Sequence, residues 1–140
     1  MAFNVGISEI LVLQTKRFKK LFFVYIANME DVLLNNIKII FNSAELVYDS
    51  KDYTSATILY FKTLFVALDL IIFNKNKFTP KDHTERFRIL QRDFPNYYSI
   101  LDKYFPIYQT TYSTMIDKGT CKEIRENVIK IIKKNFRISI

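Results

Sequence analysis

The chain has 140 residues, of which 49% are hydrophobic, 25% are charged and 16% are aromatic, and its net charge is +7. This length fits one domain, and the composition excludes a disordered chain. A single cysteine, Cys121, excludes an internal disulfide, and with one histidine, His83, it argues against a His/Cys metal site. The two glycines and three prolines favour a few long helices over a sheet.

The positive charge favours anionic partners, although a lysine-rich surface can also serve solubility alone. The lone thiol indicates a reducing compartment, so we expect a cytoplasmic protein. The apolar run of residues 10–13 is too short to span a bilayer, and no secretory signal pattern precedes it. We therefore predict neither a membrane nor a cofactor as partner.

The first segment, residues 7–27, fits two structures. Its apolar residues form one helical stripe: Ile7, Leu11, Phe18, Phe22 and Tyr25. The same segment also fits two strands, residues 10–15 and 21–26, but no Gly or Asn stands between them to form a tight hairpin. We favour a helix here, as an element additional to the main domain.

Residues 29–48 and 51–74 are predicted as two further helices. We expect the first to begin at Asn28 as N-cap, with Glu30 and Asp31 in its first turn. Asp49 and Ser50 interrupt the pattern and can cap the second helix. That helix is apolar on nearly all sides, so it is expected in the middle of a bundle. A membrane-spanning helix is the alternative, but Lys62 and Asp69 would be costly in lipid.

The remaining segments are shorter. Thr79 and Pro80 are predicted to start a helix that runs to about Arg92. Residues 96–117 are predicted to form a helix capped by Asn96, with a kink or break before Pro106. Thr120 and Glu123 form a capping box for the last helix, and the tail after Asn135 is expected to fray. The buried stripe of that last helix is expected at Ile124, Val128, Ile131 and Ile132.

The sequence contains no catalytic motif. Gly6 and Gly119 are too far apart for a glycine-rich phosphate loop. A Cys121–His83 dyad would require the fold to bring the two together, and a structural cysteine is the favoured interpretation. Basic segments at 16–20, 75–81, 86–92 and 130–137 suit phosphate contacts, and tyrosines at helical spacing suit base stacking or, more commonly, a core.

One segment resembles the first two helices of HEPN domains. It contains Ala44-x-Leu46, then Asp52-Tyr53-x-x-Ala56, then Tyr60-Phe61 and Ala67. His83 at the start of a short third helix, a tyrosine-bearing fourth helix and a charged final helix extend the resemblance to about residues 29–136. The resemblance divides the single domain, residues 1–140, into an N-terminal extension (1–27) and a HEPN-like bundle (28–136).

The resemblance implies an antiparallel bundle of four to five helices that is commonly dimeric. Many HEPN domains pair with a nucleotidyltransferase in toxin–antitoxin modules, and the catalytic members are RNases with an Arg-x4-x-His motif. That motif is missing here: Phe78 stands five residues before His83. The resemblance therefore implies a non-nucleolytic homodimer that binds RNA, a nucleotide or a nucleotidyltransferase-type protein.

The predicted contacts lie on and after the third helix: Lys81, His83, Arg86, Arg88 and Tyr112. Two other functions stay open. A helical structural subunit without a nucleic-acid role should expose an apolar patch. An RNase with an unusual site would need His83, Tyr112 and a basic residue in one pocket.

Overall fold

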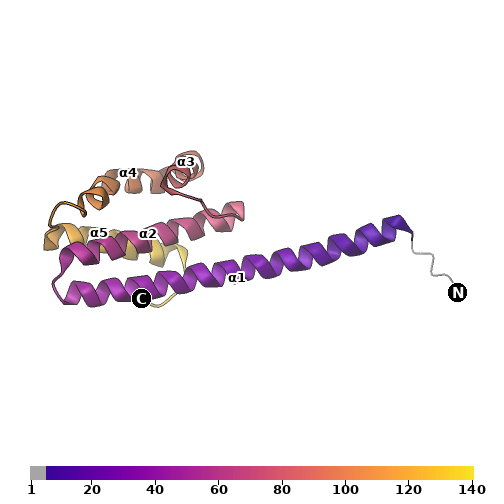
Figure 1. Ribbon diagram of the computed structural model, residues 1–140, viewed down its shortest axis with the longest axis horizontal. Helices are drawn as coiled ribbons and strands as arrows, with labels where there is room; N and C mark the ends of the chain where they lie inside the picture. The colour runs from indigo at the N-terminus through magenta and orange to yellow at the C-terminus, as the bar shows by residue number, and fades with distance from the viewer. Residues whose placement is uncertain (1–5) are drawn as a thin grey trace.

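The computed structural model describes residues 6–140, and residues 1–5 of the predicted N-terminal extension lie outside the described residues. The described chain is all-α, which confirms the predicted fold class. It contains α1 (Ile7–Asp49), α2 (Tyr53–Asn76), α3 (His83–Asp93), α4 (Pro95–Thr110) and α5 (Lys118–Asn135). Figure 1 shows α1 and α2 as an antiparallel pair, with the other helices stacked on α2.

The first helix is longer than predicted. Residues 7–27 are helical, so the two-strand alternative is wrong. The predicted start at Asn28 is also wrong, because α1 continues through this residue without a break. No glycine or proline stands between residues 7 and 49, and Asn28 is exposed where its amide can be hydrated.

The bundle is built around α2. The carboxylate of Asp52 caps this helix by accepting a hydrogen bond from the Ser55 amide at 3.0 Å. The connection from α1 places Lys51 in the left-handed region at φ 68°. Among the described helices α2 alone is long and apolar enough to cross a membrane, but 72% of its apolar window is buried inside the bundle. Its central position confirms the prediction.

Two predicted helix starts are wrong. The third helix starts at His83, not Thr79, because Asp82 accepts a hydrogen bond from the Glu85 amide at 2.8 Å and is the stronger cap. The fourth helix starts at Pro95, where the fixed φ of proline suits the first helical position, so Asn96 is not the cap.

The fourth helix ends earlier than predicted. It stops at Thr110 rather than near 117, where the hydroxyls of Thr110 and Thr111 bond back to carbonyls three residues earlier. It is not broken at Pro106. Pro106 lies on the exposed side of the helix, where a missing hydrogen bond is better tolerated than on the packed side.

The last helix starts at Lys118, capped by Asp117, so the predicted Thr120 cap is wrong by one turn. Asp117 accepts from the Thr120 amide at 2.8 Å. The predicted stripe of four residues in α5 is buried, as expected. The tail leaves the helix after Asn135, yet Phe136 is buried and Ile138 packs against the core, so the tail is not simply frayed.

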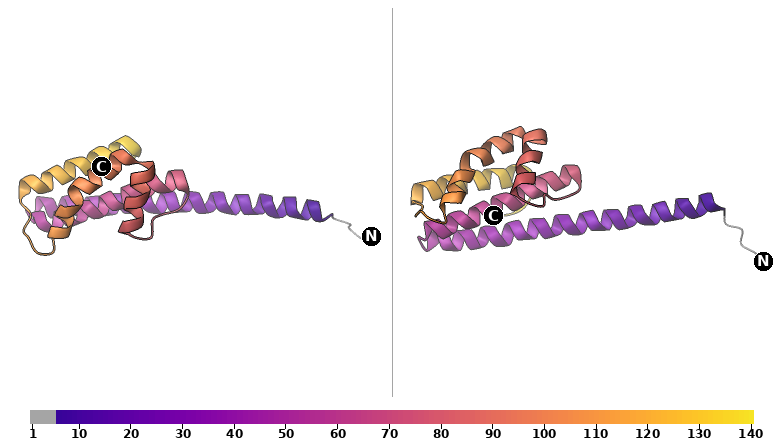
Figure 2. Two further views of the ribbon diagram at one scale, coloured as in Figure 1. Left: turned by 90° about the horizontal axis from the view of Figure 1, so that it is seen from above. Right: turned by 45° about the horizontal axis from the view of Figure 1, so that its top comes forward.

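The core fills only part of the length of α1. Ile37, Phe41 and Ala44 are buried against α2, whereas the helix before Ile26 extends beyond the bundle. Figure 2 shows the same projection from two other directions. We call residues 7–26 of α1 the arm. At 1.5 Å per residue the arm is about 30 Å long.

Candidate functional site

Two of the predicted contact residues meet at the start of α3. Arg86 donates two hydrogen bonds to Asp69 of α2, from Nε to Oδ1 at 2.6 Å and from Nη2 to Oδ2 at 2.9 Å. Its Nη1 donates to His83 Nδ1 at 2.7 Å. Only 7% of Arg86 is exposed. The Arg86 guanidinium therefore links α3 to α2 through a buried ion pair.

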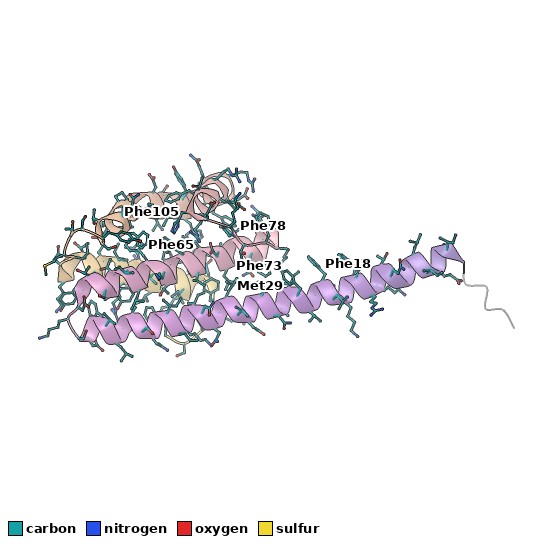
Figure 3. The ribbon with its side chains drawn as sticks, in the orientation of Figure 1. Phe18, Met29, Phe65, Phe73, Phe78 and Phe105 are labelled. Atoms are coloured by element: carbon teal, nitrogen blue, oxygen red, sulfur yellow. The ribbon has the colours of Figure 1, made fainter. Side chains whose placement is uncertain are left out.

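Aromatic rings flank one side of this polar group, and His83 itself is exposed to solvent. The His83 ring lies 4.7 Å from Phe65 of α2 and 5.3 Å from Phe105 of α4, measured between ring centroids. Figure 3 shows Phe65 and Phe105 close together between α2 and α4. Tyr108 extends the cluster and lies 6.2 Å from Tyr112, which is 82% exposed. Tyr112 thus reaches the cluster only through Tyr108.

The protonation of the cluster follows from its hydrogen bonds. His83 Nδ1 accepts from Arg86, so the imidazole is neutral and its remaining proton lies on Nε2. Burial, and then the charge of Arg86, lower the pKa of His83. Burial raises the pKa of the Asp69 carboxyl, and the hydrogen bonds from Arg86 oppose that effect. Because Arg86 is already paired, it offers little positive charge to a ligand.

The other predicted contacts do not join this cluster. Lys81 lies before α3 and is exposed, and Arg88 is exposed on α3 itself. The structure brings His83 and Arg86 into direct contact, and Tyr112 is connected to them only through Tyr108. Asp69, which was considered above only as a charge that would be costly in lipid, is the partner that sequence reasoning missed. Its place inside an otherwise apolar run was the available signal.

Cys121 is fully buried in α5. Burial raises the pKa of its thiol, which opposes the low pKa that a first-turn thiol can have. A buried, protonated thiol is a poor nucleophile, and the structural interpretation of this residue fits its surroundings.

A second ion pair joins α1 to α5. Arg125 donates from Nε and Nη2 to the two oxygens of Glu45 at 2.7 and 2.9 Å. The Tyr60 hydroxyl donates to Glu45 at 3.0 Å, and burial raises the pKa of that hydroxyl. Sequence reasoning missed this group because its members are 15 and 80 residues apart in the chain. It closes the bundle rather than forming an open site.

Most of the large apolar side chains that the bundle leaves exposed lie on the arm. Ten large apolar side chains in it are more than 40% exposed: Ile7, Ile10, Leu11, Val12, Phe18, Leu21, Phe22, Phe23, Val24 and Tyr25. Figure 3 shows Phe18 on the projecting part of α1, away from the packed Phe73 and Met29. Lys16, Lys19 and Lys20 line a shallow hollow there with Phe23 and Val24. Soluble monomers rarely expose so large a contiguous apolar surface.

A groove between α4 and α5 offers a smaller polar surface. Its volume is about 240 Å³, and its lining includes Tyr97, Asn127, Lys130 and Lys134. The Tyr97 hydroxyl is held by Asn135 at 2.8 Å. The groove thus combines an aromatic ring, an amide and two cations.

No group of three or more His, Cys, Asp or Glu side chains in residues 6–140 is placed to hold a metal ion. Comparisons with protein-family models, with curated proteins and with solved structures found no match to this chain.

Proposed function

We propose that this protein is an interaction module that assembles with a protein partner through the arm of α1. The observation that carries the proposal is the exposure of ten large apolar side chains on a helix that the bundle does not cover. Such a surface marks a protein-interaction site because leaving it in water is unfavourable. The bundle then serves as a rigid base that holds the arm in a helical form.

The helix order supports a HEPN-like version of this proposal. A long apolar second helix, a short third helix that begins at His83 and a charged last helix follow the order that the resemblance implies. The polar groups of the bundle support a structural role for this part of the chain, since Arg86 is neutralised by Asp69 and Cys121 is buried, so we assign binding to the arm.

Amide hydrogen exchange on the full chain, combined with light scattering, tests the proposal. If the arm binds a partner protein or another copy, its amides should be protected in the assembled state and lose protection on dilution to monomer. An uncovered arm would fray from its free end, because a short helix without packing is only marginally stable. A protein that stays monomeric at all concentrations, with unprotected arm amides, and that gains no protection in a cell extract would contradict the proposal.

The groove between α4 and α5 supports a second candidate, binding of RNA or a nucleotide. Lys130 and Lys134 can contact phosphates, and Tyr97 can stack on a base. A titration with labelled single-stranded RNA at low and moderate salt tests it. Lys130→Gln with Lys134→Gln should weaken binding and its salt dependence, whereas Lys81→Gln with Arg88→Gln removes the same charge elsewhere and is the control. Equal losses in both pairs would indicate non-specific attraction.

A further inference from the structure

A regular stripe of exposed apolar side chains runs along the whole of α1. Its six residues are between 48% and 73% exposed and follow one another at intervals of seven: Leu11, Phe18, Tyr25, Val32, Ile39 and Leu46. Three lie in or at the end of the arm, and three lie where the opposite side of α1 packs on the bundle. We call this stripe the seam.

Along the packed half of α1 the seam faces away from the bundle, whereas the Tyr25 ring of the seam reaches Phe73 of α2, with 6.4 Å between the ring centroids. Five residues of helix correspond to about 140° of rotation beyond one full turn, so Ile37 and Ala44 lie far around α1 from Val32 and Ile39. Ile37 and Ala44 are fully buried, whereas Val32 and Ile39 are more than half exposed. Figures 1 and 2 show α2 to α5 gathered on one side of α1, and Figure 1 shows the C-terminal tail crossing the packed half of α1.

The spacing of the seam identifies the shape of what covers it. A stripe that repeats every seven residues drifts by about 20° per heptad around a straight helix, or about 100° over the five intervals here. A flat membrane surface would select a straight stripe along one side, whereas a second helix that winds around α1 follows the drift. The seam supplies one apolar core position in each of six consecutive heptads, whereas the second core position is apolar only at Leu21.

The positions between the seam residues point to a second copy of the same chain. The other core position of the heptad, three residues after each seam residue, holds Gln14, Leu21, Asn28, Asn35, Asn42 and, at the end of α1, Asp49. The three asparagines are exposed. In a parallel two-fold pair each asparagine meets its own counterpart, and an amide is self-complementary because it both donates and accepts. An unrelated helix would need three matching polar residues in the same register.

The charges along α1 fit the same arrangement. Arg17, Asp31 and Lys38 lie just before seam positions, where a parallel partner presents the residues five places further along its own helix. In the second copy these are Phe22, Asn36 and Ser43, none of which is charged. Parallel pairing of two copies therefore places no like charges opposite each other at these sites.

We infer that the seam is a homotypic coiled-coil surface, and that two copies of this chain pair through parallel α1 helices with their bundles on the outside. This inference rests on the proposed function and names the partner as a second copy. The arm supplies the apolar layers around Leu11, Phe18 and Leu21, and the asparagines fix the register at some cost in stability.

Single cysteines in the seam test the pairing and its direction. In a parallel pair Val32→Cys and Leu46→Cys should each form a disulfide with the same residue of the second copy under mild oxidation by copper phenanthroline and oxygen. Ala27→Cys is exposed but lies off the seam, and it should remain a thiol. Native Cys121 is buried, so the unsubstituted protein measures the background. Cross-linking only between Leu46→Cys and Leu11→Cys would overturn the parallel arrangement.

A charged substitution in the seam tests the same surface through its effect on the dimer dissociation constant. Ile39→Asp should raise the dimer dissociation constant by about 100-fold or more, because an unpaired charge would be buried against its own copy. Met115→Asp also replaces an exposed apolar residue but lies off α1, and it should change the constant by less than about threefold. Equal dimer dissociation constants for the two variants would contradict the proposal that the seam is the dimer interface. Assembly that survives Ile39→Asp, with a protected arm, would leave the proposed function standing with another partner.

Discussion

The two halves of α1 share one uninterrupted helix but differ in what surrounds them. In residues 27–49 one side of the helix lies against α2, and Phe41 on that side is 3% exposed, whereas Ile39 on the opposite side is 55% exposed. In the arm the apolar side chains lie in solvent, and Phe18 is 69% exposed. Both halves are rich in residues that a core would accept. The difference shows that a chain without glycine or proline can form one helix throughout, whereas the position of α2 decides which half is buried within one chain.

The largest test of this contrast uses one residue type in both halves. Phe41→Ala should lower the free energy of unfolding by about 3–5 kcal/mol, because it leaves a cavity in the packed core. Phe18→Ala should change it by less than about 0.5 kcal/mol when the protein is dilute enough to be monomeric. Urea unfolding followed by circular dichroism measures both. Similar losses for the two variants would mean that the arm is packed within the monomer.

A second test addresses the charges that hold the bundle together. Asp69→Asn should cost about 3 kcal/mol or more, since it leaves the Arg86 guanidinium buried without its counter-ion. Replacing both residues, Asp69→Leu with Arg86→Met, should recover most of that loss. In the arm, Lys19→Gln removes an exposed charge and should have almost no effect. A double-mutant cycle in urea separates the pairing energy from the two single changes.

The fold class could be predicted from the sequence more accurately than the residues of the site. The run of α2 is apolar on nearly all sides, and this central helix was predicted with nearly correct bounds. The apolar stripe of α5 has the period of a helix packed on one side, and this helix was predicted with a start one turn late. The helix starts were misplaced because Thr79, Asn96 and Thr120 compete with Asp82, Pro95 and Asp117, and local sequence does not decide which one the packed helix uses. The partners of Arg86 and Arg125 come from distant segments, so no local pattern could identify them.

A smaller effect is expected from pH, and it should be confined to the bundle. The pKa of His83 is lowered in the folded protein, so below about pH 6.5 the unfolded chain binds a proton that the folded chain resists. The contribution of neutral His83 to the free energy of unfolding should therefore be fully present above that pH and should decrease as the pH falls further. His83→Gln should remove this component of the decline while the carboxylates, Asp69 among them, still titrate. Thermal unfolding between pH 7.5 and 5 compares the two proteins, and identical slopes would contradict the assignment.

The smallest effect concerns the connection between α1 and α2, just after the packed half of α1 ends at Asp49. Lys51 has φ 68°, a conformation that costs a residue with a side chain about 1 kcal/mol but costs glycine almost nothing. Lys51→Gly should therefore relieve about 1 kcal/mol of strain, and the greater freedom of glycine in the unfolded chain should offset about half of it, for a net stabilisation of about 0.5 kcal/mol. Lys62→Gly makes the same replacement at an exposed position inside α2 and should destabilise by about 1 kcal/mol. Opposite signs in urea unfolding would show that the turn at Lys51 is fixed by the packing of α1 on α2. The same sign in both would mean that this turn relaxes and does not determine where the packed half ends.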